Sequence, residues 1–194
     1  MEKEEKREKL VKLKAKMKAD KSLPLQEGNL NLVFGEGNAD ATVMFIGEGP
    51  GFNEDQQGRP FVGRAGKLLN EMLDSINLPR SEVFITNVVH YRPPNNRDPE
   101  PDEITAFGEY LDKIIKIVDP DIIATLGRFS MAKFIPDVKI SDVHGKMRRI
   151  KWDGKDVWIV PLYHPAAALR NGNIKERAME DIKAIRHILK NNGK

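Results

Sequence analysis

The stretch Gly47-Glu48-Gly49-Pro50-Gly51, which continues to Gly58-Arg59-Pro60-Phe61-Val62-Gly63, is a loop rich in glycine and proline. The apolar run 41–46 precedes this loop and predicts a strand, and the helix-like segment 65–76 follows it. In open α/β sheets, ligands bind at loops that leave the carboxyl ends of the strands. Because glycines let a ligand approach the backbone and prolines fix the shape of the loop, this stretch predicts a binding site.

Strands and helices alternate along the rest of the chain. Segments rich in apolar and β-branched residues predict strands at residues 30–34, 42–47, 83–89, 122–126, 146–152 and 155–160. Amphipathic segments predict helices at residues 62–76, 102–118, 128–134 and 174–190. Asp102 is the expected N-cap of the second of these helices. We therefore expect an α/β fold, a three-layer α/β/α sandwich with a central, mostly parallel four-stranded sheet.

The first 22 residues differ in composition from the remainder. Residues 2–19 predict a highly charged helix with one narrow apolar stripe, formed by Leu10, Leu13 and Met17. We expect residues 1–22 to form a charged helix and linker whose lysines face solvent, and residues 23–194 to form a single domain.

Composition limits the class of protein further. The 194 residues carry a net charge of +3 with clustered lysines and arginines, which permits a nucleic-acid partner. The absence of cysteine excludes disulfides, thiolate zinc sites and a cysteine nucleophile. No apolar run reaches the ~20 residues of a membrane span, and residues 1–6 lack the apolar core of a signal peptide. We expect a monomeric, cytoplasmic, nucleoid-associated protein without membrane contact.

Polar residues follow three of the expected strands. Glu48 follows the first, Asn87 lies at the end of the second, and His164 follows the strand that ends near residue 160. The carboxyl ends of parallel strands meet at one edge of a sheet, so these side chains are expected to converge there. With the aromatic Phe61 nearby, the set predicts a ligand site for a polar, flat-ringed molecule.

The order of these motifs resembles the uracil-DNA glycosylase superfamily, and most closely its family 4. The resemblance runs from about residue 23 to the final helix. The segments that carry it are residues 33–38, Gly47 to Gly51, Glu54-Asp55, Gly58 to Gly66, Ile85 to Val89, Arg92-Pro93-Pro94 with Asn96-Arg97, and His164 to Ala167 with Leu169-Arg170. The resemblance implies an enzyme that flips uracil out of DNA and hydrolyses its N-glycosidic bond, which starts base excision repair.

The resemblance also implies roles for the site residues. Phe61 would stack on the uracil ring, Asn87 would read the Watson–Crick edge, and His164 would stabilise negative charge at uracil O2. Gly49 stands where the best-known branch of the superfamily has a water-orienting aspartate, as in family 4. Glu48 would lie beside the base, and its part in activating water stays open at this point. Glu54 would either exclude the thymine methyl group or remain a solvated loop carboxylate.

The remaining implied contacts are with DNA, either single- or double-stranded. Arginines would pair with phosphates, and Leu169 or Arg170 would enter the gap left by the flipped base. The expected DNA-contacting residues are Arg59, Arg64, Arg92, Arg97, Leu169 and Arg170.

The chain departs from family 4 at the cofactor. Family 4 proteins usually hold a [4Fe–4S] cluster on four cysteines, and the matching positions here are Asp20, Leu23, Tyr91 and Phe107. None of them can supply a thiolate, so we expect no cofactor. The mostly apolar and aromatic replacements predict a packed plug, with Asp20 at its edge.

Alternative functions remain open from the sequence. A homologue without the cluster could act mainly as a uracil- or DNA-binding module, or accept another base such as hypoxanthine. A glycosidase or nucleoside hydrolase could use a carboxylate pair such as Glu48 and Glu54, although Asn87 and His164 would then have no role. A phosphate-binding loop is disfavoured, because no Lys-Ser/Thr follows the glycines.

Overall fold

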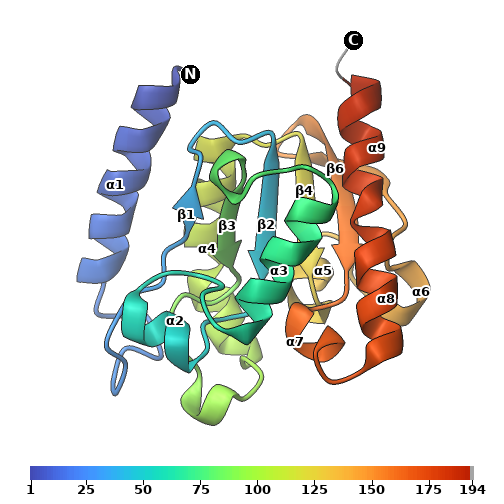
Figure 1. Ribbon diagram of the computed structural model, residues 1–194. Helices are drawn as coiled ribbons and strands as arrows, with labels where there is room; N and C mark the ends of the chain where they lie inside the picture. Colours follow the sequence, from blue (N-terminus) through green and yellow to red (C-terminus); the bar gives the residue numbers. More distant parts are fainter. Residues whose placement is uncertain (193–194) are drawn as a thin grey trace.

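A central sheet covered by helices on both faces forms the framework of the computed structural model, which describes residues 1–192 (Figure 1). Within these residues the sheet has six strands, in the order β1-β3-β2-β4-β6-β5. The strands are β1 (Glu36–Gly37), β2 (Val43–Gly47), β3 (Phe84–Asn87), β4 (Ile122–Leu126), β5 (Arg148–Trp152) and β6 (Lys155–Leu162). The expected α/β/α sandwich is confirmed, but the expected count of four strands is wrong. The four inner strands are parallel, and β1 and β5 extend them by pairing antiparallel at the two edges.

Helices form the two outer layers. They are α1 (Lys3–Ala19), α2 (Phe52–Gln57), α3 (Arg64–Ser75), α4 (Pro101–Val118), α5 (Arg128–Ala132), α6 (Ile140–Val143), α7 (Pro165–Ala168), α8 (Gly172–Asp181) and α9 (Lys183–Asn192). Among the described residues, no helix is both long and apolar enough to cross a membrane.

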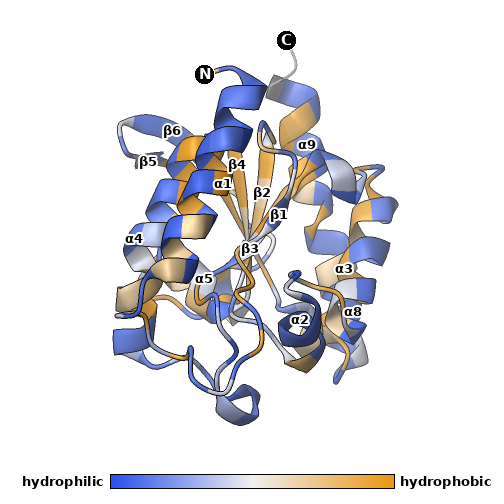
Figure 2. Ribbon diagram, turned by 90° about the vertical axis from the view of Figure 1, so that its left-hand side faces the viewer, coloured by the Kyte–Doolittle hydropathy of each residue, from blue (hydrophilic) through white to orange (hydrophobic). Residues whose placement is uncertain are grey.

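The period-2 alternation of the strands fills both layers of the core. In β2, Met44 and Ile46 pack into a hydrophobic cluster with residues of α1 and α4. Val43 and Phe45 point the other way, into a cluster with residues of α3, α8 and α9. Figure 2 shows the two helical layers on either side of the sheet. A strand buried on both faces needs apolar residues at every position, which accounts for the continuous apolar run before the glycine-rich loop.

Segment 30–34 is not a strand, contrary to the expectation. The backbone N–H groups of Leu30 and Asn31 donate to the Asp55 carboxylate at 3.0 and 3.2 Å, and that of Val33 donates to the carbonyl of His90 at 2.9 Å. The Asp55 side chain of α2 therefore accepts the backbone N–H groups that a strand would donate to a neighbouring strand. The segment runs as an extended connection that anchors α2.

Helix boundaries also differ from the sequence expectation. Glu100, rather than Asp102, is the N-cap of α4, and the Glu103 carboxylate accepts the Glu100 backbone N–H at 2.8 Å. Asp102 lies two residues after the N-cap, in the acidic first turn. The single closing helix expected at 174–190 is two helices, because a tight turn at Ile182 separates α8 from α9. The short helices α2 and α6 occupy segments in which no helix was predicted.

α1 packs along α4 through its narrow apolar stripe, whose three residues are buried. Lys6 is buried with them, and its Nζ donates to the Asp40 carboxylate at 2.6 Å and to the Val118 carbonyl at 2.9 Å. Val118 is the last residue of α4, so the ammonium group binds a carbonyl that the helix itself leaves unpaired. The other lysines of α1 are exposed, as expected.

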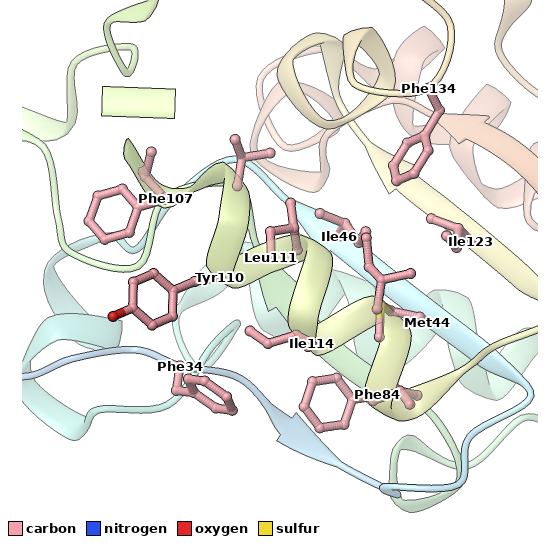
Figure 3. Close-up of a cluster of buried hydrophobic side chains, with 14 of the residues drawn as sticks. Phe34, Met44, Ile46, Phe84, Phe107, Tyr110, Leu111, Ile114, Ile123 and Phe134 are labelled. Carbon is pink, nitrogen blue, oxygen red and sulfur yellow. The ribbon is translucent and has the colours of Figure 1, made fainter. Parts of the chain in front are cut away.

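An apolar plug occupies the positions that match the cluster cysteines of family 4. Leu23, Tyr91 and Phe107 are buried in one hydrophobic cluster, and the Tyr91 and Phe107 ring centroids lie 6.2 Å apart. Figure 3 shows Phe107 and Tyr110 side by side on α4. Asp20 lies at the edge of this cluster, and its carboxylate accepts a 2.8 Å hydrogen bond from the Tyr110 hydroxyl. The predicted plug is confirmed.

Replacing the central ring of the plug should lower the free energy of unfolding. Phe107 is fully buried, so we expect Phe107→Ala to cost about 3–5 kcal/mol through lost transfer energy and the cavity that remains. Urea titration followed by circular dichroism measures the loss. Leu30→Ala is the control, because Leu30 is exposed and its truncation should change stability by no more than about 0.5 kcal/mol. Equal effects of the two substitutions would contradict the plug.

Candidate active site

A pocket of about 350 Å³ opens at the carboxyl ends of the parallel strands. Three connections meet there: the glycine-rich loop after β2, the end of β3, and the turn between β6 and α7. The parallel register sets Gly47 of β2 directly beside Asn87 of β3. The lining residues include Glu48, Gly49, Glu54, Phe61, Asn87, Asn96, Arg97, Asp98, His164 and Arg170. The expected convergence of strand ends is thus present in the structure.

Asn87 presents an unpaired amide to this pocket. The residue is 1% exposed, yet neither its side-chain nitrogen nor its oxygen has a hydrogen-bond partner among the described residues. Leaving a buried polar group unsatisfied costs about 1–3 kcal/mol, so such groups are rare in folded proteins. A ligand that offers both an acceptor and a donor would remove this penalty.

Phe61 forms one wall of the pocket in a strained backbone conformation. Its φ angle is +51°, which a bulky L-residue seldom adopts. Gly47 makes room for the ring, because a Cβ there would lie 2.6 Å from the ring and 2.4 Å from the Asn87 amide oxygen. Arg80 fastens the loop by donating to the carbonyls of Pro60 at 2.6 Å and Phe61 at 3.2 Å. The ring is therefore fixed in place before any ligand arrives.

His164 is a neutral imidazole with a defined tautomer. It is the N-cap of α7, and its Nδ1 accepts the backbone N–H of Ala166 at 3.1 Å. Burial lowers the pKa of His164 to about 4, with the Glu54 carboxylate opposing the shift, so the ring is uncharged at neutral pH. With Nδ1 used as an acceptor, the proton resides on Nε2. The ring centroid lies 5.7 Å from that of Phe61, which places a donor beside the aromatic wall.

Glu48 contributes a carboxyl group that titrates near neutral pH. Burial raises its pKa to about 7, and the negative charge of Asp98 adds to the shift while Arg128 opposes it. Asp98, in the loop before α4, and Arg128, the first residue of α5, are themselves joined in an ion pair. A carboxylate with a pKa near the working pH is suited to general acid–base chemistry.

Glu54 organises the loop around the pocket. Its carboxylate accepts the backbone N–H groups of Val62 and Gly63 at 2.8 Å each, and that of Gly51 at 3.2 Å. The solvated loop carboxylate considered in the sequence analysis is therefore wrong, although Glu54 does line the pocket. Gly49 also lines it, in a place where a Cβ would lie 2.7 Å from a methyl group of Val89.

The six expected DNA-contacting residues divide by position. Arg97 and Arg170 line the pocket, and Leu169 is exposed next to Arg170. Arg97 is held by the Glu103 carboxylate through hydrogen bonds of 2.6 and 2.9 Å.

The other three arginines lie outside the pocket lining. Arg59 forms an ion pair with Glu36 at 2.7 Å, Arg64 begins α3 on the surface, and Arg92 lies over the Phe52 ring.

Sequence reasoning missed four residues that shape this site. Arg80 and Arg128 carried no local signal, because their partners are distant in sequence. Asn96 and Asp98 follow the Arg-Pro-Pro motif in a segment rich in polar residues. That setting marked them as a loop but gave no indication that they would wall a pocket.

Two features elsewhere are separate from this site. A larger cavity of about 580 Å³ lies between α4 and the β5–β6 hairpin, but it lacks a converging set of unpaired polar groups. Within residues 1–192 there is no group of three or more His, Cys, Asp or Glu side chains that could hold a metal ion.

Comparisons with known proteins identify the family. A family model described as the uracil DNA glycosylase superfamily matches residues 34–185. The type-4 uracil-DNA glycosylase of Sulfurisphaera tokodaii is 49% identical over 185 residues, which cover 92% of this chain and 84% of the relative. That of Archaeoglobus fulgidus is 46% identical over 167 residues, 83% of each chain, and that of Thermotoga maritima is 41% identical over 191 residues, 96% and 98%. The chain therefore belongs to the uracil DNA glycosylase superfamily.

Proposed function

We propose that this protein is a uracil-DNA glycosylase, which hydrolyses the N-glycosidic bond of uracil in single- or double-stranded DNA. The observation that carries the proposal is the buried, unpaired Asn87 amide, which lines the same pocket as the Phe61 ring and the His164 donor. The family supports it, since relatives with this name match over most of the chain. To reach the pocket, the base must leave the helix stack and be flipped into it.

Asn87 selects uracil by hydrogen-bond complementarity. Its amide oxygen accepts from uracil N3–H, and its amide nitrogen donates to uracil O4. Cytosine presents the reverse pattern at these atoms, an acceptor at N3 and a donor at N4. Binding uracil satisfies both orphaned atoms, while cytosine leaves donor facing donor and acceptor facing acceptor.

His164 stabilises charge on the leaving base. As the C1′–N1 bond breaks, its electron pair moves onto uracil, and the sugar takes oxocarbenium character. The neutral imidazole donates from Nε2 to the O2 atom where charge accumulates, in the manner of an oxyanion hole.

Glu48 completes the hydrolysis. Its carboxylate accepts a proton from the water that adds to C1′, which leaves an abasic sugar. The uracil anion then takes up one proton, which restores the Glu48 carboxylate when it comes from there, and free uracil departs. The fixed Phe61 ring stacks on the base and holds it in line for departure.

The geometry disfavours the glycosidase alternative. A retaining or inverting glycosidase needs two free carboxyl groups flanking the bond. Glu54 binds three backbone N–H groups in the loop, which removes it as a partner for Glu48. No observation favours hypoxanthine or a purely binding role over uracil release.

Arg170 lines the pocket and Leu169 is exposed beside it, so we assign these two residues to the contact with the DNA backbone and to the gap left by the flipped base. Arg97, also on the rim, reaches phosphate only if it exchanges Glu103 for that anion. The protein acts as a monomer with no cofactor in this proposal.

The purified protein should release uracil from an oligonucleotide in the presence of a metal chelator. The matched thymine oligonucleotide should stay intact, and alkaline cleavage of abasic sites measures the difference. Asn87→Asp should abolish most uracil release and shift preference towards cytosine, because a carboxylate meets O4 as acceptor against acceptor.

Asn96→Asp is the control for this pair of experiments, since Asn96 lines the same pocket but its amide oxygen is bonded to Arg92. It should keep the preference for uracil. Absence of uracil release by the unaltered protein at high enzyme excess would overturn the proposed function. Unchanged base preference in Asn87→Asp would remove Asn87 from the reading of the base.

His164→Ala should lower the single-turnover rate by roughly 10²–10³-fold and leave DNA affinity nearly unchanged. The imidazole acts on charge that appears only in the transition state, so its loss is not felt in the ground state. Rapid-quench kinetics and fluorescence anisotropy measure the two quantities on the same oligonucleotide. A parallel drop in rate and affinity would assign His164 to ground-state binding instead.

Uracil release should depend on pH through Glu48. Because its pKa is raised to about 7, the carboxyl group is mostly protonated at pH 6 and mostly ionised at pH 8, so the rate should rise with pH, reach half its maximum near pH 7 and level off above about pH 8. The His164 imidazole stays neutral between pH 6 and pH 8, so it should add no second pH-dependent change to the rate of uracil release. Glu48→Gln should release uracil slowly, and its rate should not rise between pH 6 and pH 8. A profile that keeps its midpoint in Glu48→Gln would exclude Glu48 as the base.

A further inference from the structure

Phe52 is an aromatic residue left in solvent at the first position of α2. Its exposed fraction is 56%, one of the highest among the large apolar residues of the chain. Single exposed apolar side chains are common in proteins and need no explanation by themselves. What distinguishes Phe52 is its position and its partner.

Phe52 lies on the rim of the candidate active site. Gly51 before it and Glu54 after it both line the pocket. α2 is anchored on both sides, by Glu54 to the Phe61 loop and by the Asp55 carboxylate to the backbone of segment 30–31. The backbone that carries the ring is therefore held at the rim.

Arg92 covers one face of the ring. The guanidinium carbon lies 5.3 Å from the ring centroid, and Nε donates to the Asn96 amide oxygen at 2.7 Å. Asn96 in turn lines the pocket. The ring and the cation thus join α2 to the loop at residues 91–100 across the rim, and a solvent-exposed part of the ring remains uncovered.

We propose that Phe52 is a stacking platform for a second nucleobase, that of a nucleotide next to the one extruded into the pocket. The inference rests on the proposed function, because it requires DNA at this rim. Aromatic rings bind bases through their π-faces without regard to base identity, and an adjacent guanidinium contributes cation–π attraction and a positive charge for the backbone.

The platform predicts a difference between single and double strands. In a duplex, the neighbouring base is already stacked and paired, so a protein ring adds little. In a single strand, the same base has lost these partners and gains a stacking surface. We therefore infer that Phe52 supports action on single-stranded DNA more than on duplex DNA.

Phe52→Ala should weaken binding of a uracil-containing single strand by roughly 5- to 150-fold and weaken duplex binding less. Val11→Ala is the matched control, since Val11 is 63% exposed on α1 and should leave both affinities unchanged. Fluorescence anisotropy measures both, and Phe52 is exposed, so folding should be preserved. Equal affinity of Phe52→Ala and the unaltered protein for the single strand would overturn the proposal.

A second variant separates this inference from the proposed function. In Phe52→Trp, the introduced indole should be quenched by single-stranded DNA, beyond the signal of the native tryptophans in the unaltered protein. Quenching without uracil release would overturn the glycosylase proposal and support the platform. Uracil release without quenching, together with unchanged single-strand affinity in Phe52→Ala, would support the glycosylase proposal and overturn the platform.

Discussion

The carboxylate of Glu54 is the contact on which the geometry of the site depends. It binds backbone N–H groups at both ends of the loop, Gly51 on one side and Val62 and Gly63 on the other. Charged acceptors form the stronger class of hydrogen bonds, and three of them on one carboxyl group close the loop into a rigid ring. The closed loop, together with the Arg80 hydrogen bonds to the Pro60 and Phe61 carbonyls, holds Phe61 at a positive φ angle with its ring lining the pocket. Preorganisation of this kind lowers the conformational entropy that the loop would otherwise lose on binding a base.

The order of elements and the position of the site could be predicted from the sequence, because both follow from local signals. Apolar runs marked the parallel strands, and the polar residues at their ends marked Asn87 and His164. Edge strand β5 falls within the predicted strand at residues 146–152, but edge strand β1 was missed, since it has only two residues and gives no alternation to detect. The function of Glu54 and Arg80 could not be predicted, because each side chain bonds to backbone groups of the Phe61 loop. Backbone groups are the same for nearly every residue type, so the sequence gives no sign of such a contact. Contacts of this type appear only once the chain has folded.

Glu48 and His164 show how burial in one pocket changes the pKa of an acid and of a base in opposite directions. Burial disfavours charge in both cases, so it raises the pKa of the Glu48 carboxyl group and lowers that of the His164 imidazole. The imidazole is left as a neutral donor and the carboxyl group as a base near its midpoint. The desolvation that makes the pocket costly to form thus also assigns the two groups their separate roles in the proposed reaction.

The contact between Lys6 of α1 and the end of α4 has a consequence for the order in which the chain folds during synthesis. Lys6 bonds to the carbonyl of a residue 112 positions further along, at the end of α4. At ordinary translation rates of about 5–20 residues per second, Lys6 is synthesised on the order of 6 to 20 s before that carbonyl is made. During this interval the apolar stripe of α1 has no partner. Lysine and glutamate side chains surround the stripe, and surface charge of this density disfavours association with other chains in the interval before α4 is made.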